Sequence, residues 1–224
     1  MNHYRKIEAV LFDQDGVIID SEGIRRKTWI EALAIYGVQV TDKEFDEDYK
    51  DMMGKPSLKN AEYLVRKYEI KTTPEEFLRK REELLDKYFP TIGLREGVRD
   101  LLDYLKERGI EMALVTSAFR RHVEMSLKNN GLEDYFTVII SKEDIRKGKP
   151  DPEPYRLACE KLGIKPKNAV VIEDSENGVL SGKRAGCLVI AVRHRWNQHL
   201  DFSSTDYVAE DMIEIGEIIK SMIS

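Results

Sequence analysis

The chain has 224 residues, of which 42% are hydrophobic and 34% are charged. This length and composition suit a folded chain with a sizeable core and exclude a disordered protein. Lys and Arg number 36 against 41 Asp and Glu, and the resulting formal net charge of −5 argues against nucleic-acid binding, which needs a basic surface. No apolar run approaches the roughly 18–20 residues of a membrane span. Because no secretory signal is found either, we expect a cytoplasmic protein that does not bind membranes.

Short apolar runs alternate with amphipathic, charged segments along most of the chain. Five such runs are rich in β-branched residues and end at Gly, Pro or polar residues, which is typical of buried parallel strands. They lie at residues 9–12, 112–115, 138–140, 169–172 and 188–192. Helical patterns lie between them, for example at 96–108 and at 152–162, each followed by a glycine. The alternation predicts an α/β fold with a Rossmann-like parallel sheet. Cys159 and Cys187 have no zinc spacing, and we expect both to be buried.

The region from residue 20 to residue 89 contains helical patterns and no convincing strand. Four helices are predicted in it, at residues 23–36, 42–53, 58–68 and 74–88. Thr41 with Glu44, and Thr73 with Glu76, have the spacing of capping boxes at two of the helix starts. We therefore expect a helical-bundle cap domain at 19–90, inserted into an α/β core made of residues 1–18 and 91–224.

The first candidate motif follows the first predicted strand and reads Asp13-Gln-Asp15-Gly16. Two carboxylates in the turn after a strand fit a polar loop or the cap of the next helix equally well. In the functional interpretation, Asp13 attacks an electrophile while Asp15 donates and accepts a proton on the leaving group. Gly16 allows the tight turn that both interpretations need.

Two further polar positions follow later strands, at the edge of a parallel sheet where ligands bind. Thr116 and Ser117 end the second strand, where a hydroxyl either binds a phosphoryl oxygen or only caps the helix expected from about residue 118. Lys149 precedes Asp151 and Pro152, which we interpret as the N-cap and first position of a helix. The lysine is either a ligand for an anion near this edge or a solvated side chain.

Glu173 and Asp174 end the fourth strand. Two adjacent carboxylates at the end of a buried strand are unfavourable without a cation, although acids are also common at a helix N-terminus. Oxygen ligands without His or Cys favour Mg²⁺ over zinc.

Taken together, these four motifs in this order closely resemble the haloacid dehalogenase-like superfamily of phosphohydrolases and phosphomutases, and the helical insertion is similar to the family's cap. The resemblance implies that Asp13 is the nucleophile and forms an aspartyl-phosphate, and that Asp15 is the general acid and then the base. It implies that Thr116 and Lys149 bind the phosphoryl group. It further implies that Mg²⁺ is held by Asp13, the backbone carbonyl of Asp15, and Asp174, with Glu173 as a direct or water-mediated partner.

The activity that the resemblance implies is a phosphatase acting on a small phosphorylated metabolite, with a β-phosphoglucomutase-type phosphomutase as the alternative. Asp15 counts against a dehalogenase, since dehalogenases generally lack this second carboxylate. Mutases of that type usually have a His where this chain has Arg25, an Arg where it has Ser57, and Ser-Lys-Asn at residues 118–120. A binding protein without turnover would be expected to lack Asp13 or Asp15.

Substrate contacts are expected from the cap and from the loop after the second strand. Gly54 and Lys55 resemble the family's substrate-specificity loop, and Arg25, Ser117, Arg120 and the segment 193–196 are further candidates, although a charged residue in such a place is more often a solvated surface charge. Trp29 is expected in the core of the cap, and His122 and His199 at the surface. A cap that covers the site within one chain makes a monomer the expectation.

Overall fold

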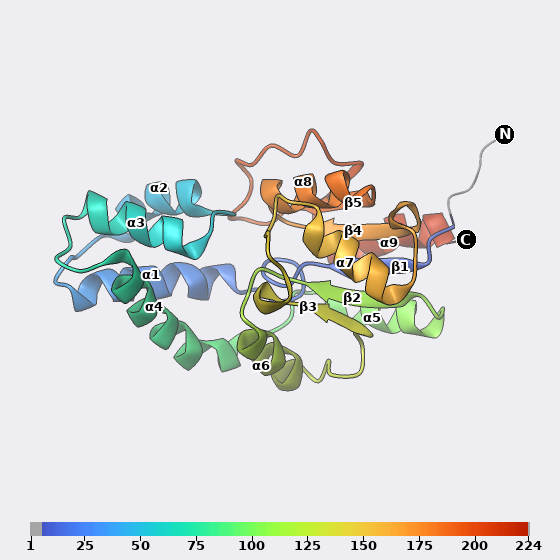
Figure 1. Ribbon diagram of the computed structural model, residues 1–224, viewed down its shortest axis with the longest axis horizontal. Coiled ribbons are helices and arrows are strands. Elements are labelled where there is room, and N and C mark those ends of the chain that lie inside the picture. Colours follow the sequence, from blue (N-terminus) through green and yellow to red (C-terminus); the bar gives the residue numbers. More distant parts are fainter. Residues whose placement is uncertain (1–5, 224) are drawn as a thin grey trace. The chain divides into compact units, whose positions relative to one another are not determined.

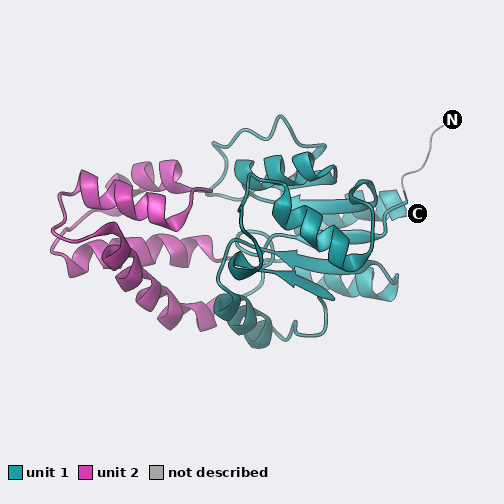
Figure 2. Ribbon diagram, viewed as in Figure 1, with its two compact units in different colours: residues 1–20, 93–224 teal, residues 21–92 magenta. Residues whose placement is uncertain are grey.

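The computed structural model describes residues 6–223 and contains a parallel sheet with surrounding helices and a separate group of four helices (Figure 1). Contacts between Cα atoms divide the chain into two compact units, an α/β unit of residues 1–20 and 93–224 and a helical unit of residues 21–92 (Figure 2). The expected domain boundaries at 18/19 and 90/91 lie two residues away from this division.

The sheet of the α/β unit has six strands in the order β3-β2-β1-β4-β5-β6, and all neighbouring pairs are parallel. The strands are β1 (Ala9–Phe12), β2 (Glu111–Val115), β3 (Val138–Ile140), β4 (Ala169–Glu173), β5 (Leu188–Val192) and β6 (Tyr207–Ala209). The strand order reverses beside β1, so the carboxyl ends of β1, β2 and β4 meet at the switch point where doubly wound sheets bind ligands. The α/β fold with a Rossmann-like sheet is thus confirmed.

Helices cover both faces of this sheet (Figure 1). They are α5 (Val98–Glu107), α6 (Arg120–Asn130), α7 (Glu153–Leu162), α8 (Glu176–Ala185) and α9 (Met212–Ile223), with short 3₁₀ turns at Lys142–Asp144 and Pro166–Asn168. Strand residues alternate between the faces: Leu11, Val115 and Val171 pack with buried residues of α7 and α8, while α5 and α9 pack on the other face. Cys159, on α7, and Cys187, which follows α8, are buried in this core.

The helical unit consists of α1 (Glu22–Ile35), α2 (Asp42–Met52), α3 (Ser57–Lys67) and α4 (Pro74–Tyr88), followed by a 3₁₀ turn at Phe89–Thr91. The capping box of Thr41 with Glu44 is present at the start of α2. Trp29 is buried and stacks on Phe77 with 6.1 Å between ring centroids, as expected of a core residue. Arg26 is also buried and pairs with two carboxylates of α2, so it holds α1 to α2.

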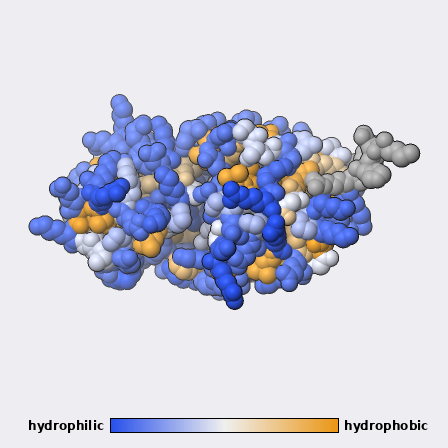
Figure 3. All heavy atoms as spheres, turned by 45° about the horizontal axis from the view of Figure 1, so that its top comes forward, coloured by the Kyte–Doolittle hydropathy of each residue, from blue (hydrophilic) through white to orange (hydrophobic). Residues whose placement is uncertain are grey.

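The surface carries mostly hydrophilic residues, with small apolar patches, on the face that Figure 3 shows. Among residues 6–223, no helix has both the length and the apolar character that crossing a bilayer requires.

Three local expectations differ from the structure. α6 begins at Arg120, two residues later than expected, because Phe119 still has an extended backbone. α7 begins at Glu153, so Pro152 and not Asp151 is at the N-cap position, and the Asp151 carboxylate accepts a hydrogen bond from the Glu153 backbone at 3.0 Å. Strand β6 was not predicted, because its three residues are mostly exposed and carry no buried apolar run.

Candidate active site

Three of the predicted motifs come together because they follow neighbouring parallel strands. Asp13 directly follows β1, Thr116 follows β2, and Glu173 is the last residue of β4. β1 pairs with both β2 and β4, and the backbone N–H of Asp13 donates to the Ile172 carbonyl at 3.0 Å. The sheet therefore places a carboxylate, a hydroxyl and a second carboxylate at one edge.

Lys149 links these strand ends through its ammonium group. The Nζ donates hydrogen bonds to Asp13 Oδ1, to Glu173 Oε1 at 2.6 Å and to the Val115 carbonyl at 3.0 Å. All three protons of the ammonium are thus used, one on each of the strands β1, β4 and β2. The interpretation of Lys149 as a solvated side chain is wrong, since this side chain is 7% exposed.

The protonation of this pair follows from its burial and charges. Burial raises the pKa of Asp13 well above its ordinary value, opposed by Lys149 and reinforced by the nearby carboxylates of Glu173 and Asp174. Burial also acts to lower the pKa of Lys149, but the charges and hydrogen bonds of Asp13 and Glu173 outweigh it, so this pKa is raised. The lysine therefore stays a cation, while burial and the neighbouring carboxylates oppose the ionisation of Asp13 and Lys149 favours it.

Glu173 is fully buried, and both of its oxygens accept hydrogen bonds. Besides Lys149, the hydroxyl of Tyr155 donates to Oε1 at 2.7 Å, and the backbone N–H of Asp174 donates to Oε2 at 3.1 Å. Gly178, in the first turn of α8, lies against this carboxylate, since an added Cβ would come closer than 3.0 Å to its carbon and both oxygens. With its oxygens used this way, Glu173 holds Lys149 in place.

Asp174 is buried as well and is held from two sides. His194 Nε2 lies 3.0 Å from Asp174 Oδ2, and the Asn197 side chain donates to the Asp174 backbone carbonyl at 2.9 Å. Gly16, with a left-handed backbone at φ 75°, passes so near that a Cβ would clash with the Asp174 carboxylate. The turn of the first motif thus rests directly on the fourth motif.

A group of three carboxylates in this edge has the composition of a cation site. Oxygens of Asp13, Glu173 and Asp174 lie within 4.8 Å of one another, and all three residues are buried. Lys149 is the cation that bonds directly to two of them, which leaves a surplus of negative charge in a buried place. Hard oxygen ligands of this kind suit Mg²⁺.

The remaining positions of the motifs lie as follows. Thr116 is buried, and its hydroxyl accepts a hydrogen bond from the Ala118 backbone at 3.0 Å, but it does not cap α6, whose N-cap position is Phe119. Ser117 beside it is exposed, and Asp15 is half-buried in the turn that follows β1.

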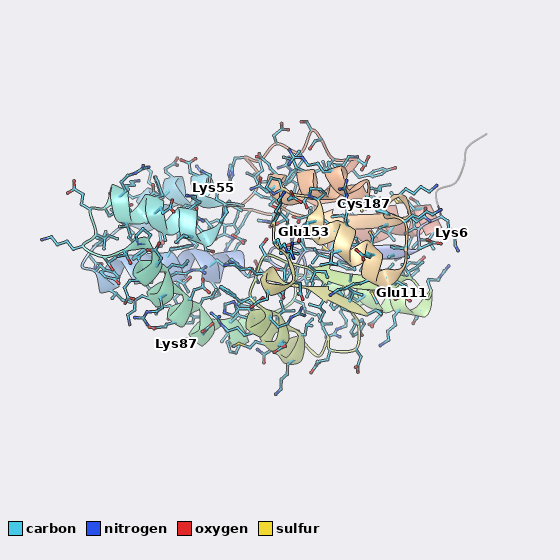
Figure 4. The ribbon with its side chains drawn as sticks, viewed as in Figure 1. Lys6, Lys55, Lys87, Glu111, Glu153 and Cys187 are labelled. Carbon is cyan, nitrogen blue, oxygen red and sulfur yellow. The ribbon has the colours of Figure 1, made fainter. Side chains whose placement is uncertain are left out.

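The candidate substrate contacts are divided between the two units. Gly54 and Lys55 are exposed in the turn between α2 and α3 of the helical unit (Figure 4), and Arg25 is on α1 with its Nε 4.0 Å from a Glu22 oxygen. Arg120 is in the α/β unit, where its guanidinium pairs with Asp144 and donates to the Ile139 carbonyl at 3.3 Å. Its charge is therefore partly satisfied within its own unit.

Sequence reasoning missed four residues that support the site. Tyr155 bonds to Glu173, and Asn197 to Asp174. Arg95 bonds to the carbonyls of Gly16 and Arg193, and burial lowers its pKa. Gly178 stands in the fourth motif, but nothing in the sequence marked its contact with Glu173.

The expectation for His122 is wrong, while that for His199 is confirmed. His199 is exposed, but His122 is 2% exposed on α6. His122 lies beside Val123 and four positions before Ser126, and all three are buried on the same helix. This helical spacing was the available signal.

Known proteins are similar to this chain in sequence and in fold. A family model described as haloacid dehalogenase-like hydrolase matches residues 10–192. A phosphorylated carbohydrates phosphatase of Thermotoga maritima is 36% identical over 183 residues, with 80% of this chain and 82% of the relative covered. The pyrophosphatase PpaX of Bacillus velezensis is 30% identical over 226 residues, with 96% and 97% covered. A crystal structure of Rhodobacter sphaeroides CbbY in complex with xylulose-(1,5)bisphosphate has a TM-score of 0.80 and 26% identity, with 94% and 96% covered.

Proposed function

The chain belongs to the haloacid dehalogenase-like hydrolase family, and from that premise we propose that it is a Mg²⁺-dependent phosphatase of small phosphate monoesters. The observation that carries the proposal is Lys149, which joins the carboxylates of Asp13 and Glu173 at the switch point of the sheet. The relative from Thermotoga maritima that dephosphorylates carbohydrates supports a sugar phosphate or a similar metabolite as the substrate.

In the proposed reaction, a carboxylate oxygen of Asp13 attacks phosphorus, and the bond from phosphorus to the ester oxygen breaks. Asp15 gives a proton to the leaving oxygen, which departs as an alcohol. Water then attacks the phosphorus of the aspartyl-phosphate while Asp15 takes up a proton, and the products are inorganic phosphate and free Asp13. Asp15, half-buried and two residues from the nucleophile, has the access to solvent that this exchange needs.

The phosphoryl group must be held beside an anion, which is the main electrostatic cost of the reaction. Two unit negative charges about 4 Å apart repel by about 4 kcal/mol at an effective dielectric constant of about 20. Lys149 offsets this repulsion with a charge that Glu173 and Val115 keep in place. We assign binding of the phosphoryl oxygens to the hydroxyl of Thr116 and to Lys149, which would give up its hydrogen bond to Asp13 for the phosphoryl group.

The carboxylates present fit a magnesium ion. Asp13, the backbone carbonyl of Asp15, and Asp174 would hold it, with Glu173 acting through water because hydrogen bonds already occupy both of its oxygens. The buried negative charge of Asp13, Glu173 and Asp174, whose oxygens lie within 4.8 Å of one another, supports this. When bound, the ion neutralises charge on the phosphoryl oxygens.

The helical unit is proposed as the cap that selects the leaving group, with Arg25, Gly54 and Lys55 as its contacts. Ser117 and Arg120 are the candidates from the α/β unit. We predict that the enzyme is a monomer and that it is located in the cytoplasm.

The phosphatase is preferred over the phosphomutase because Arg25 and Ser57 replace the residues usual in mutases. Incubation with β-glucose 1-phosphate and a trace of the 1,6-bisphosphate separates the two. Free phosphate supports the phosphatase, and glucose 6-phosphate without free phosphate supports the mutase.

The direct test of the proposal is Asp13→Asn, assayed by phosphate release from sugar phosphates, phosphoglycolate and nucleotides. We expect turnover to fall by more than about a thousandfold, as for the loss of other nucleophiles, with unchanged circular dichroism. Asp100→Asn, at an exposed position of α5, is the matched control and is expected to keep wild-type activity. Near-wild-type activity of Asp13→Asn would contradict the mechanism.

A further inference from the structure

His194 is the side chain next to Asp174 that the proposed reaction does not use. It follows β5, and its Nε2 lies 3.0 Å from Asp174 Oδ2. Among the described residues, the cluster that could hold a metal consists of Asp13, Glu173 and Asp174, without His194. The histidine therefore contacts one carboxylate of the cluster from outside it.

The hydrogen bond on the other ring nitrogen identifies the tautomer. The backbone N–H of Trp196 donates to His194 Nδ1 at 3.2 Å, so Nδ1 is the acceptor and carries no proton. The ring proton is then on Nε2, and the imidazole donates it to Asp174 Oδ2. A neutral histidine in this tautomer orients the carboxylate without cancelling its charge.

The loop that carries His194 is itself fixed to the site. The buried Asn197 accepts a hydrogen bond from the His194 backbone at 2.8 Å and donates to the carbonyls of Asp174 and Val192, both at 2.9 Å. Arg95 donates to the carbonyl of Arg193 at 3.1 Å and also to that of Gly16. One loop thus reaches both the side chain and the backbone of Asp174.

We infer that His194 is a positioning residue, which turns Asp174 so that its carboxylate is ready to bind a divalent cation. The inference rests on the proposed function in taking Asp174 as a metal ligand. Partners that orient a ligand in this way raise metal affinity by about 10- to 100-fold in other metal sites.

Three variants separate the two hydrogen bonds of the ring. His194→Gln places an amide N–H where the ring Nε2 was, so the hydrogen bond to Asp174 is kept. The acceptor for the Trp196 backbone N–H is lost. His194→Asn places an acceptor where the ring Nδ1 was, so the hydrogen bond from the Trp196 backbone is kept. The hydrogen bond to Asp174 is lost. Phe loses both. His199→Phe, at an exposed position further along the same loop, is the control.

The measurement is the Kd of Mn²⁺ for the substrate-free protein, from electron paramagnetic resonance of the free ion. We expect His194→Asn and His194→Phe to weaken binding by about tenfold or more, and His194→Gln and His199→Phe to stay within about threefold of wild type. Thermal unfolding of each variant checks that the protein is folded. If His194→Phe does not fold, the comparison of His194→Gln with His194→Asn alone decides the inference.

The inference is overturned if His194→Asn binds Mn²⁺ with the same affinity as wild type. It is also overturned if His194→Gln loses as much Mn²⁺ affinity as His194→Asn does. Asp174→Asn distinguishes these results from a failure of the proposed function. If Asp174→Asn binds Mn²⁺ as well as wild type does, Asp174 is not a ligand and the proposed metal site is wrong. If it loses binding and His194→Asn does not, only the role of His194 is wrong.

Discussion

Replacing Gly178 by Ala adds one methyl group against the most buried carboxylate of the site. The new Cβ would lie closer than 3.0 Å to the Glu173 carboxyl group, whereas ordinary carbon contacts are about 3.5–4.0 Å. Gly178 is in the first turn of α8 and follows the Ser175 cap, so the backbone has little freedom to retreat. The carboxylate must therefore move by roughly 1 Å or more.

Such a movement breaks hydrogen bonds that have no substitute in a buried place. The bonds from Tyr155, at 2.7 Å, and from Lys149, at 2.6 Å, both end on Glu173 Oε1. A hydrogen bond to a charged group contributes about 1.5–3 kcal/mol, while Ala in a helix is favoured over Gly by about 1 kcal/mol. We expect a net loss of about 2–5 kcal/mol in the free energy of unfolding. Because Lys149 loses its support, we also expect phosphatase activity to fall by about a hundredfold.

Gly216→Ala makes the same substitution in α9, where nothing lies within 4 Å of the added Cβ. This control is expected to raise the free energy of unfolding by about 0.5–1 kcal/mol and to leave activity unchanged. Urea unfolding and phosphate release measure both quantities for each variant. If Gly178→Ala unfolds within about 0.5 kcal/mol of wild type and retains at least half of its activity, the account of Glu173 as a crowded support for Lys149 is refuted.

Three further outcomes are expected. Chelation with EDTA should abolish phosphate release and Mg²⁺ should restore it, and full activity after exhaustive chelation would contradict the metal site. Burial acts to raise the pKa of Asp48, but hydrogen bonds from Lys67, Tyr63 and Tyr68 lower it overall. The ionised Asp48 therefore stabilises the folded protein at pH values above its pKa in the unfolded chain, about 4. This stabilisation is lost as the pH falls through the pKa of Asp48 in the folded protein. Asp48→Asn should thus cost about 1–3 kcal/mol at pH 7 and less near pH 3, and an equal cost at both pH values would count against this. Gln14→Met should raise the free energy of unfolding by about 1–2 kcal/mol, because both amide atoms of the fully buried Gln14 are without a protein partner; calorimetry showing a loss would speak against it.

The parts of the site that follow strand ends could be predicted from the sequence. Asp13, Thr116 and Glu173 each come directly after or at the end of an apolar run, and parallel strands bring such positions to one edge whatever the details of packing. The sequence alone does not distinguish Lys149 from an ordinary loop lysine, which is usually solvated. Helices α2 and α4 of the insertion were predictable for a similar local reason, since Thr41 and Thr73 cap them from the residue directly before each helix.

The supporting contacts could not be predicted, because each depends on which way a helix or loop turns in the folded chain. Tyr155 reaches Glu173 only through the rotation of α7 on the sheet, and an aromatic residue in that place is usually plain core. His194 contacts Asp174 only because Asn197 holds its loop, 23 residues along the chain from the carbonyl that Asn197 binds. A sequence pattern marks residues that a reaction needs, whereas the residues that orient them are common types in irregular segments. The roles of Tyr155, His194 and Asn197 therefore follow from their hydrogen bonds, and variants that keep one bond while removing another are the experiments that measure them.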